Sequence, residues 1–125
     1  MNLVWNIEPM GSPRMTRADA WKDRPVVLRY HKFRDEVNFA MKKVDVDWSK
    51  FHRLTVVFYI PMAKSWSMKK KVKMAGKPHQ QKPDIDNLVK ALLDSIFRGG
   101  DDCKVWDINA MKLWTMGSGR IEITT

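Results

Sequence analysis

The order of apolar and polar residues along the chain outlines a small fold that mixes helices and strands. Leu3 to Ile7 is mostly apolar and is predicted to form a first strand. Apolar residues at three- and four-residue steps predict a helix from Arg29 to about Val44. A β-branched and aromatic run predicts a buried strand from Arg53 to Ile60, and the most regular helical pattern covers Ile85 to Phe97.

Proline, glycine and basic residues occupy the segments between these elements. Residues 11–28 lack periodicity and are predicted to form a long loop. Residues 62–82 are predicted to form a basic connector with one short helix, Ser67 to Lys73. Two further strands are predicted near Lys104 to Leu113 and Arg120 to Thr125, and the glycine-rich turn between them favours an antiparallel hairpin.

The resulting order is strand, helix, strand, helix, strand, strand, which favours an α+β fold, an α/β sandwich. We expect a small mixed sheet of about four strands, with the two main helices packed on one face. At 125 residues the chain suits one domain, so residues 1–125 are taken as a single unit. No apolar run is long enough to cross a membrane, and the single cysteine, Cys103, excludes an internal disulfide. These features predict a protein of the reducing cytoplasm.

Charge is distributed unevenly along the chain, whose formal net charge is +9. Residues 48–83 contain nine lysine or arginine side chains and no aspartate or glutamate, whereas five aspartates fall within residues 84–102. A basic surface with one acidic cluster predicts a protein that binds a polyanion and has a metal site set into that surface. The alternative for the basic excess alone is a solvated, lysine-rich surface.

The acidic cluster begins at the last predicted helix. Asp86, Lys90 and Asp94 step by four residues, so they line up along one edge of the buried helix face, where a cleft can form. Asp84 can meet Asp86 only if it precedes the first helical turn, and its position after a proline suits a helix N-cap. The sequence therefore allows the two carboxylates to meet at the helix start.

Each charged residue of the cluster also has a plain structural explanation. Asp84 has the chemistry of an N-cap alone, and Asp86 that of a favourable charge in the first helical turn. Lys90 suits surface ion pairs with its acidic neighbours on the helix. Asp101 and Asp102 are common turn residues before a strand. Together these explanations leave the concentration of acids unexplained, so both interpretations stay open.

Clustered carboxylates in a basic protein suit the hydrolysis of phosphodiesters. Mg²⁺ prefers hard oxygen ligands, keeps several waters and takes few carboxylates. Such an ion binds a phosphate oxygen, activates water and stabilises the leaving oxygen. Lys90, on the same helix edge, would hold the phosphate or stabilise charge in the transition state, or else only offset the adjacent acids.

Two motifs resemble those of the RusA-type Holliday-junction resolvases, small endodeoxyribonucleases found largely in phages and prophages. They are K-P-D-I-D-N-L-V-K-A-L-L-D, residues 82–94, and G-G-D-D-C-K-V, residues 99–105. The resemblance implies catalytic roles for three acids, which also bind the metal, and one lysine: Asp84, Asp86, Asp102 and Lys90. It makes Asp101 a further candidate ligand and gives Asp94 a supporting place.

The resemblance also implies the setting of the reaction. Members are homodimers that use Mg²⁺, with Mn²⁺ as a candidate substitute, and they nick two opposing strands of a four-way DNA junction in recombination and repair. We therefore expect branched DNA and a second copy of the chain as partners, in the cytoplasm of a bacterial host, with no membrane contact and no small-molecule substrate. Two positions depart from the family pattern: Lys104 stands where a glutamine is common, and Pro83 where a basic residue is common.

Basic residues of the first loop and the connector are the candidates for nucleic-acid contacts. They are Arg14, Arg17, Lys69, Lys70, Lys71, Lys73, Lys77 and Lys82. The tryptophans, Trp66 and Trp106 among them, are expected mainly in core or interface packing rather than in base stacking. His79 is expected to be a solvated loop residue, with contact to DNA as the alternative, and Cys103 to be a small residue at the start of a strand.

Two other functions stay open at this point. One is a non-catalytic basic module that binds nucleic acid, and the other is a metal nuclease that acts on flap DNA or RNA. The acids Asp84, Asp86 and Asp102 separate a nuclease from a binding module, because only a nuclease needs them for turnover.

Overall fold

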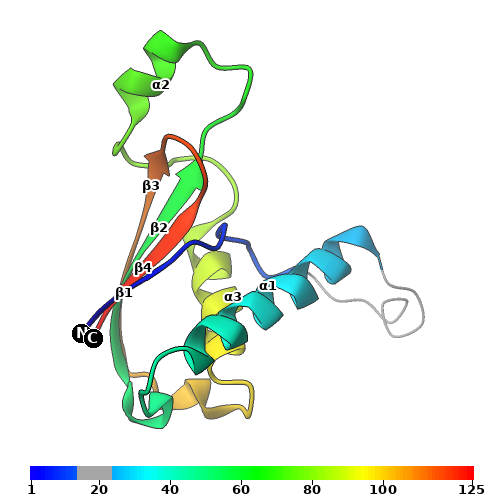
Figure 1. Ribbon diagram of the computed structural model, residues 1–125, viewed down its shortest axis with the longest axis vertical. Helices are drawn as coiled ribbons and strands as arrows, with labels where there is room; N and C mark the ends of the chain where they lie inside the picture. The colour runs from blue at the N-terminus through cyan, green and yellow to red at the C-terminus, as the bar shows by residue number, and fades with distance from the viewer. Residues whose placement is uncertain (14–23) are drawn as a thin grey trace.

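A computed structural model describes residues 1–13 and 24–125 of the protein (Figure 1). Its strands and α-helices, in chain order, are β1 (Asn2–Trp5), α1 (Pro25–Lys42), β2 (Arg53–Pro61), α2 (Met68–Met74), α3 (Ile85–Ile96), β3 (Asp107–Thr115) and β4 (Arg120–Thr124). Two 3₁₀ turns, η2 (Trp48–Lys50) and η3 (Asp101–Lys104), are also formed. The predicted α+β class is confirmed. Among the described residues, no helix is long and apolar enough to cross a bilayer.

The strands form a mixed sheet in the order β1-β4-β2-β3. β2 pairs with β3 in parallel and with β4 antiparallel, while β1 pairs antiparallel with β4. The predicted hairpin between the last two strands is therefore wrong, because β2 lies between them. The β3–β4 turn must cross the end of β2, and a Cβ on Gly119 would lie only 3.1 Å from the Tyr59 carbonyl oxygen. Glycine at this crossing permits a close approach that a side chain obstructs.

Helices α1 and α3 cover one face of the sheet, as predicted (Figure 1). The apolar stripe predicted for α3 is buried, with Leu88 and Leu92 at 0% exposure. These side chains share a core with Phe33 and Val37 of α1. The strands contribute further large core residues, which are Trp5, Leu54, Val56, Phe58, Ile121 and Ile123. Because the stripe is fixed against this core, the rotation of α3 is set, and so is the direction of its polar edge.

Helix α1 begins earlier than its apolar spacing predicted. It starts at Pro25 rather than Arg29, so the predicted loop of residues 11–28 is too long at its C-terminal end. A proline is favourable in the first helical turn, where its missing N–H has no partner to lose. Val27 in this added turn is 2% exposed and anchors it in the core. The other part of the predicted loop, residues 14–23, lies outside the described residues.

The basic connector forms an overhang at one end of the sheet, topped by α2 (Figure 1). Helix α2 confirms the predicted short helix, and the Ser67 side chain caps its N-terminus. The chain then returns along the edge of β3. The His79 N–H donates to the Lys112 carbonyl oxygen at 3.0 Å, and the Trp114 N–H donates to the Lys77 carbonyl oxygen at 2.9 Å. This return leads the chain from the overhang to the start of α3.

The acidic pair lies in a turn rather than directly before a strand. Residues 101–104 form η3, so β3 begins at Asp107 and not near Lys104. Gly100 precedes η3 with a left-handed backbone (φ 88°), which glycine adopts without steric cost. Cys103 is exposed within η3, and its predicted place at a strand start is wrong.

Candidate active site at the start of helix α3

The start of α3 has the backbone geometry that the acidic motif requires. Asp84 is the N-cap residue, with extended backbone angles (φ −68°, ψ 147°), and the helix begins at Ile85. Its side chain makes no capping hydrogen bond, and its carbonyl oxygen accepts one from the Leu88 N–H at 3.1 Å. Asp86 follows in the first turn, and both acids are exposed. The Asp84 carboxylate is therefore not used as a cap, which removes the main structural explanation for it.

The segment before α3 is held in place by Lys112 of β3. The Lys112 Nζ donates to the carbonyl oxygens of Gln81 at 2.6 Å and Pro83 at 2.9 Å. The Lys82–Pro83 peptide bond between them is cis. Hydrogen bonds donated by a charged ammonium group are stronger than those between neutral groups. Because Lys112 belongs to β3, the sheet fixes the position of the chain just before Asp84.

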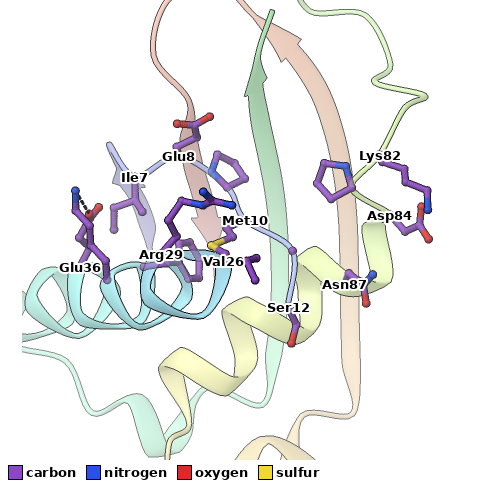
Figure 2. A pocket seen from close by; sticks show the side chains of 15 residues that line it. Ile7, Glu8, Met10, Ser12, Val26, Arg29, Glu36, Lys82, Asp84 and Asn87 are labelled. Carbon is purple, nitrogen blue, oxygen red and sulfur yellow. Dashed lines mark ion pairs between the residues drawn. The ribbon is translucent and has the colours of Figure 1, made fainter. Parts of the chain in front are cut away.

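A first cleft of about 710 Å³ opens beside Asp84, between the chain after β1, the start of α1 and the start of α3 (Figure 2). Figure 2 shows Lys82 and Asp84 next to each other at one end of this cleft and Glu36 at the other. Arg29 lines the cleft from α1. The sequence did not indicate Arg29 as a residue of this cleft, because it lines the cleft only through the position of α1 opposite the start of α3.

The wall between α3 and the chain after β1 is closely packed. A Cβ on Gly11 would lie 3.2 Å from the Pro83 Cβ and 3.5 Å from the Asn87 Cβ. The Ser12 N–H donates to the Asn87 carbonyl oxygen at 3.2 Å. The segment that leads into residues 14–23 is thus attached directly to the acidic helix.

A second cleft, of about 540 Å³, follows the edge of α3 toward η3. Lys90 and Asp94 of α3 and Asp102 of η3 line it. The Tyr30 hydroxyl donates to Asp94 Oδ2 at 3.4 Å, and the Arg34 guanidinium donates to the Asp94 carbonyl oxygen at 3.4 Å. Burial raises the pKa of Tyr30, and the nearby Asp94 carboxylate raises it further, so this hydroxyl stays protonated as a donor. The predicted edge of α3 does border a cleft, and Asp94 is tied to α1 there.

The carboxylates predicted to bind a metal do not share one cleft. Asp84 lines the first cleft and Asp102 the second, Asp86 lines neither, and Asp101 pairs with Lys104 at 3.6 Å. Within the part of the chain that the structure describes, no three acidic, histidine or cysteine side chains are grouped closely enough to hold a metal ion. Asp84 and Asp86 are exposed oxygen donors of the kind that a hard divalent cation prefers. The chemistry of these two residues fits the ion, and the full three-acid set stays a prediction.

The predicted nucleic-acid-binding residues fall into three groups. A third cleft, of about 1030 Å³, lies between α2 and the end of the sheet and is lined by Lys70, Lys71 and Lys82. Three others are exposed and do not line it, namely Lys69, Lys73 and Lys77. Arg14 and Arg17 lie outside the described residues. Because Lys82 lines both the first and the third cleft, a basic path connects α2 with Asp84.

Two aromatic side chains qualify the predictions made for them. His79 is 4% exposed rather than solvated, and its ring centroid lies 4.3 Å from that of Trp114. Trp106 is 71% exposed and therefore not a core residue, so packing at an interface stays a prediction for it; the Arg53 guanidinium lies over it, 4.9 Å from the ring centroid. The burial of His79 follows from the return of the chain along β3, which no local pattern in the sequence indicates.

Comparison with known proteins identifies a family that matches most of the chain. A family model described as endodeoxyribonuclease RusA matches residues 6–125, which include every element from α1 to β4 and all the residues that line the three clefts. No curated protein matches the chain significantly.

Proposed function

The chain belongs to the RusA endodeoxyribonuclease family, and from this we propose that it resolves four-way DNA junctions by paired, symmetric, Mg²⁺-dependent nicks. Membership makes the protein an enzyme that cuts DNA, so a non-catalytic binding module is set aside. One observation carries the finer proposal. The Asp84 carboxylate is exposed, makes no capping hydrogen bond and lines the first cleft with Lys82, which also lines the basic third cleft.

The proposed division of roles follows from the position of each side chain. Asp84 and Asp86, at the start of α3, would hold the cation, with Asp102 as the third ligand. A divalent cation bound there supplies Lewis acidity at the scissile phosphate and a more acidic water. Lys90 is exposed one turn after Asp86 on the same edge, where its ammonium group would bind the phosphate and offset charge in the transition state.

Asp102 would need to approach the start of α3, because it lines the second cleft and not the first. The turn η3 that carries it follows Gly99 and Gly100, and a Cβ on either glycine would meet no atom within 4 Å among the described residues. Because none of the described atoms packs against these two glycines on the side where a Cβ would lie, the turn before η3 can change its conformation and let η3 shift. In the proposal, η3 moves toward Asp84 when DNA and the cation bind.

Two nicks in opposing strands call for two sites, and we propose a homodimer to supply them. A symmetric dimer presents two identical sites related by a two-fold axis, which matches the pseudo-symmetry of a four-way junction. Light scattering on the purified protein tests this part directly. A mass of twice 14.7 kDa supports it, and a monomer at the concentration used for nicking contradicts it.

The substrate assignment is tested by comparing cleavage rates on different nucleic acids. A four-way junction, a flap, a linear duplex and an RNA hairpin of equal length are incubated with the protein and Mg²⁺ at one salt concentration, because phosphate contacts make affinity depend on salt. We expect the junction to be nicked fastest, at symmetric positions in two opposing strands. Chelation of divalent cations should stop nicking and leave binding intact. Faster cleavage of the flap or the RNA contradicts the junction assignment.

A further inference from the structure

The third cleft is an aromatic groove as well as a basic one. Trp66 lines it below α2, and its ring centroid lies 4.8 Å from that of Trp114 at the end of β3. Trp114 in turn contacts His79 at 4.3 Å between ring centroids. Lys70 extends from α2 over the Trp66 ring, with its Nζ 3.9 Å from the centroid. An aromatic ring that attracts a cation across an open groove is also a surface on which a base can stack.

A buried hydrogen-bonding atom faces no protein partner in this groove. His79 lines the cleft at 4% exposure, and its backbone N–H is already used by β3. Among the described residues, its Nδ1 has no hydrogen-bond partner. A buried polar atom without a partner costs free energy, and a ligand that pairs with it recovers that cost. Because this nitrogen is itself covered from solvent, a ligand in the groove can pair with it only after a local shift of the His79 ring.

The groove is continuous with the acidic start of α3. Glu8 and Lys82 line both the third cleft and the first cleft, and the first cleft contains Asp84. Lys64, Lys70 and Lys71 supply positive charge along the rest of the groove. A strand that lies in the groove therefore has a charged path to the proposed metal ligands.

We propose that this groove holds an unstacked nucleotide of the DNA strand beside the branch point. The proposal rests on the proposed function for its substrate, and it adds the surface that distinguishes branched DNA from a linear duplex. The base replaces the Lys70 ammonium group against Trp66, its polar edge pairs with His79 Nδ1, and Lys70 moves to the adjacent phosphate. The strand then passes Lys82 and reaches Asp84.

An intact duplex arm does not fit the same features. In a duplex both faces of each base are stacked on neighbouring bases, and the pairing edge is already occupied. Only a base that has left the stack can present a free face to Trp66 and a free edge to a buried histidine nitrogen. At an open junction the base pairs beside the branch point lack a stacking neighbour on one side, so their bases leave the stack at a lower cost than those of a duplex arm, and the groove favours branched over linear DNA.

The proposal is tested by binding rather than by cleavage. Fluorescence anisotropy without Mg²⁺ measures the affinity of the protein for a four-way junction and for a linear duplex of equal length at one salt concentration. We expect Trp66→Ala to weaken junction binding at least about fivefold, the lower range for losing one stacked base, and to change duplex binding less than about twofold. Trp106→Ala is the matched control, because Trp106 is an exposed tryptophan at the opposite end of β3.

A lysine pair provides a second test that does not disturb packing. Lys69 and Lys70 are adjacent exposed residues of α2, but only Lys70 lines the groove and covers Trp66. We expect Lys70→Gln to weaken junction binding about threefold or more and Lys69→Gln to have a smaller effect. A junction with 2-aminopurine at the branch point should change its fluorescence on binding the wild type, and much less on binding Trp66→Ala.

The outcomes separate this proposal from the proposed function. Equal junction affinities of folded Trp66→Ala and the wild type, or equal losses on junction and duplex, would overturn the groove proposal while junction nicking can still stand. Trp66-dependent binding by a protein that nicks no junction would retain the groove and reject the nuclease assignment. If Trp66→Ala does not fold, Lys70→Gln against Lys69→Gln decides the matter, and equal affinities of that pair reject the groove.

Discussion

The start of α3 and the aromatic groove below α2 adjoin each other, but they are built in different ways. The acidic site is local in sequence, since Asp84, Asp86 and Lys90 lie on one helix and its N-cap. The groove combines Trp66 and Lys70 of the connector with Trp114 of β3. One region is defined by a motif, and the other exists only because the connector folds back along the sheet.

If the proposed roles hold, chemistry and recognition have separate structural supports in this protein. The acids depend on the rotation of α3, which is set by buried residues such as Leu88 and Leu92. The groove depends on the return along β3 and on the close crossing of β2 at Gly119. Changes in α3 should therefore alter the rate of nicking, and changes in the overhang should alter the affinity for branched DNA.

The largest expected effect belongs to Lys90 and bears on the acidic site alone. We expect Lys90→Met to lower the nicking rate by about 10²–10³-fold, because a positive charge near the developing negative charge is lost. Junction affinity should fall less than about tenfold. Single-turnover nicking and anisotropy measure the two quantities, and Lys42→Met, at the far end of α1, is the control. A loss of affinity as large as the loss of rate would erase the distinction between the regions.

Gly119 tests the support of the groove. Alanine there places a Cβ 3.0 Å from Pro9 Cδ and 3.1 Å from Pro61 Cδ, so we expect the free energy of unfolding to fall by about 1–3 kcal/mol. Urea denaturation measures this change. Gly99→Ala is the matched control, because a Cβ at Gly99 meets no atom within 4 Å among the described residues. Equal stabilities of the two variants contradict the close crossing over β2.

Ser67 provides a smaller and more local test of the overhang. Its side chain accepts a hydrogen bond from the Lys70 N–H at 3.2 Å, so Ser67→Ala should destabilise α2 by about 1 kcal/mol. Hydrogen exchange should become faster for the amides of α2 and stay unchanged for those of α3. Faster exchange in both helices would show that the overhang and the acidic site unfold as one unit.

The smallest expected effect is the titration of His79. Burial lowers its pKa from the ordinary value of 6.5, and the Lys112 ammonium lowers it further. Because the folded pKa lies below the unfolded one, this residue contributes stability that is present above about pH 6.5 and is lost as the pH falls toward the folded pKa.

Nuclear magnetic resonance titration of the His79 ring measures that pKa directly. A pKa below 6.5 agrees with burial of a neutral ring. Removal of the imidazole in His79→Gln should make the fall of stability below pH 6.5 less steep. A value above 6.5 contradicts the buried environment. A rise of the value when junction DNA is added would further indicate that Nδ1 gains a phosphate or base partner.

Local patterns predicted the elements that carry the acids. The apolar stripe of α3 and the proline before Asp84 were enough to place the N-cap and the buried face, because both follow from one helix. Ser67 and the short helix after it were also predicted from local signals.

Longer-range relations could not be predicted from the sequence. A glycine-rich turn between two strands favours a hairpin, and only the sheet as a whole shows β2 inserted between β3 and β4. The burial of His79 depends on the return of the connector along β3. The separation of Asp102 from Asp84 depends on how η3 packs against the end of α3. These features arise from contacts between residues far apart in the chain.

The central claim is that the acids at the start of α3 carry out the cleavage of DNA. The most direct measurement is the rate of junction nicking by Asp86→Asn in Mg²⁺, at protein concentrations that saturate the junction, with Asp45→Asn as an exposed control. We predict a rate at least about 100-fold below the wild type with binding retained, because a charged oxygen donor for the cation is removed. A rate within about twofold of the wild type would contradict the account.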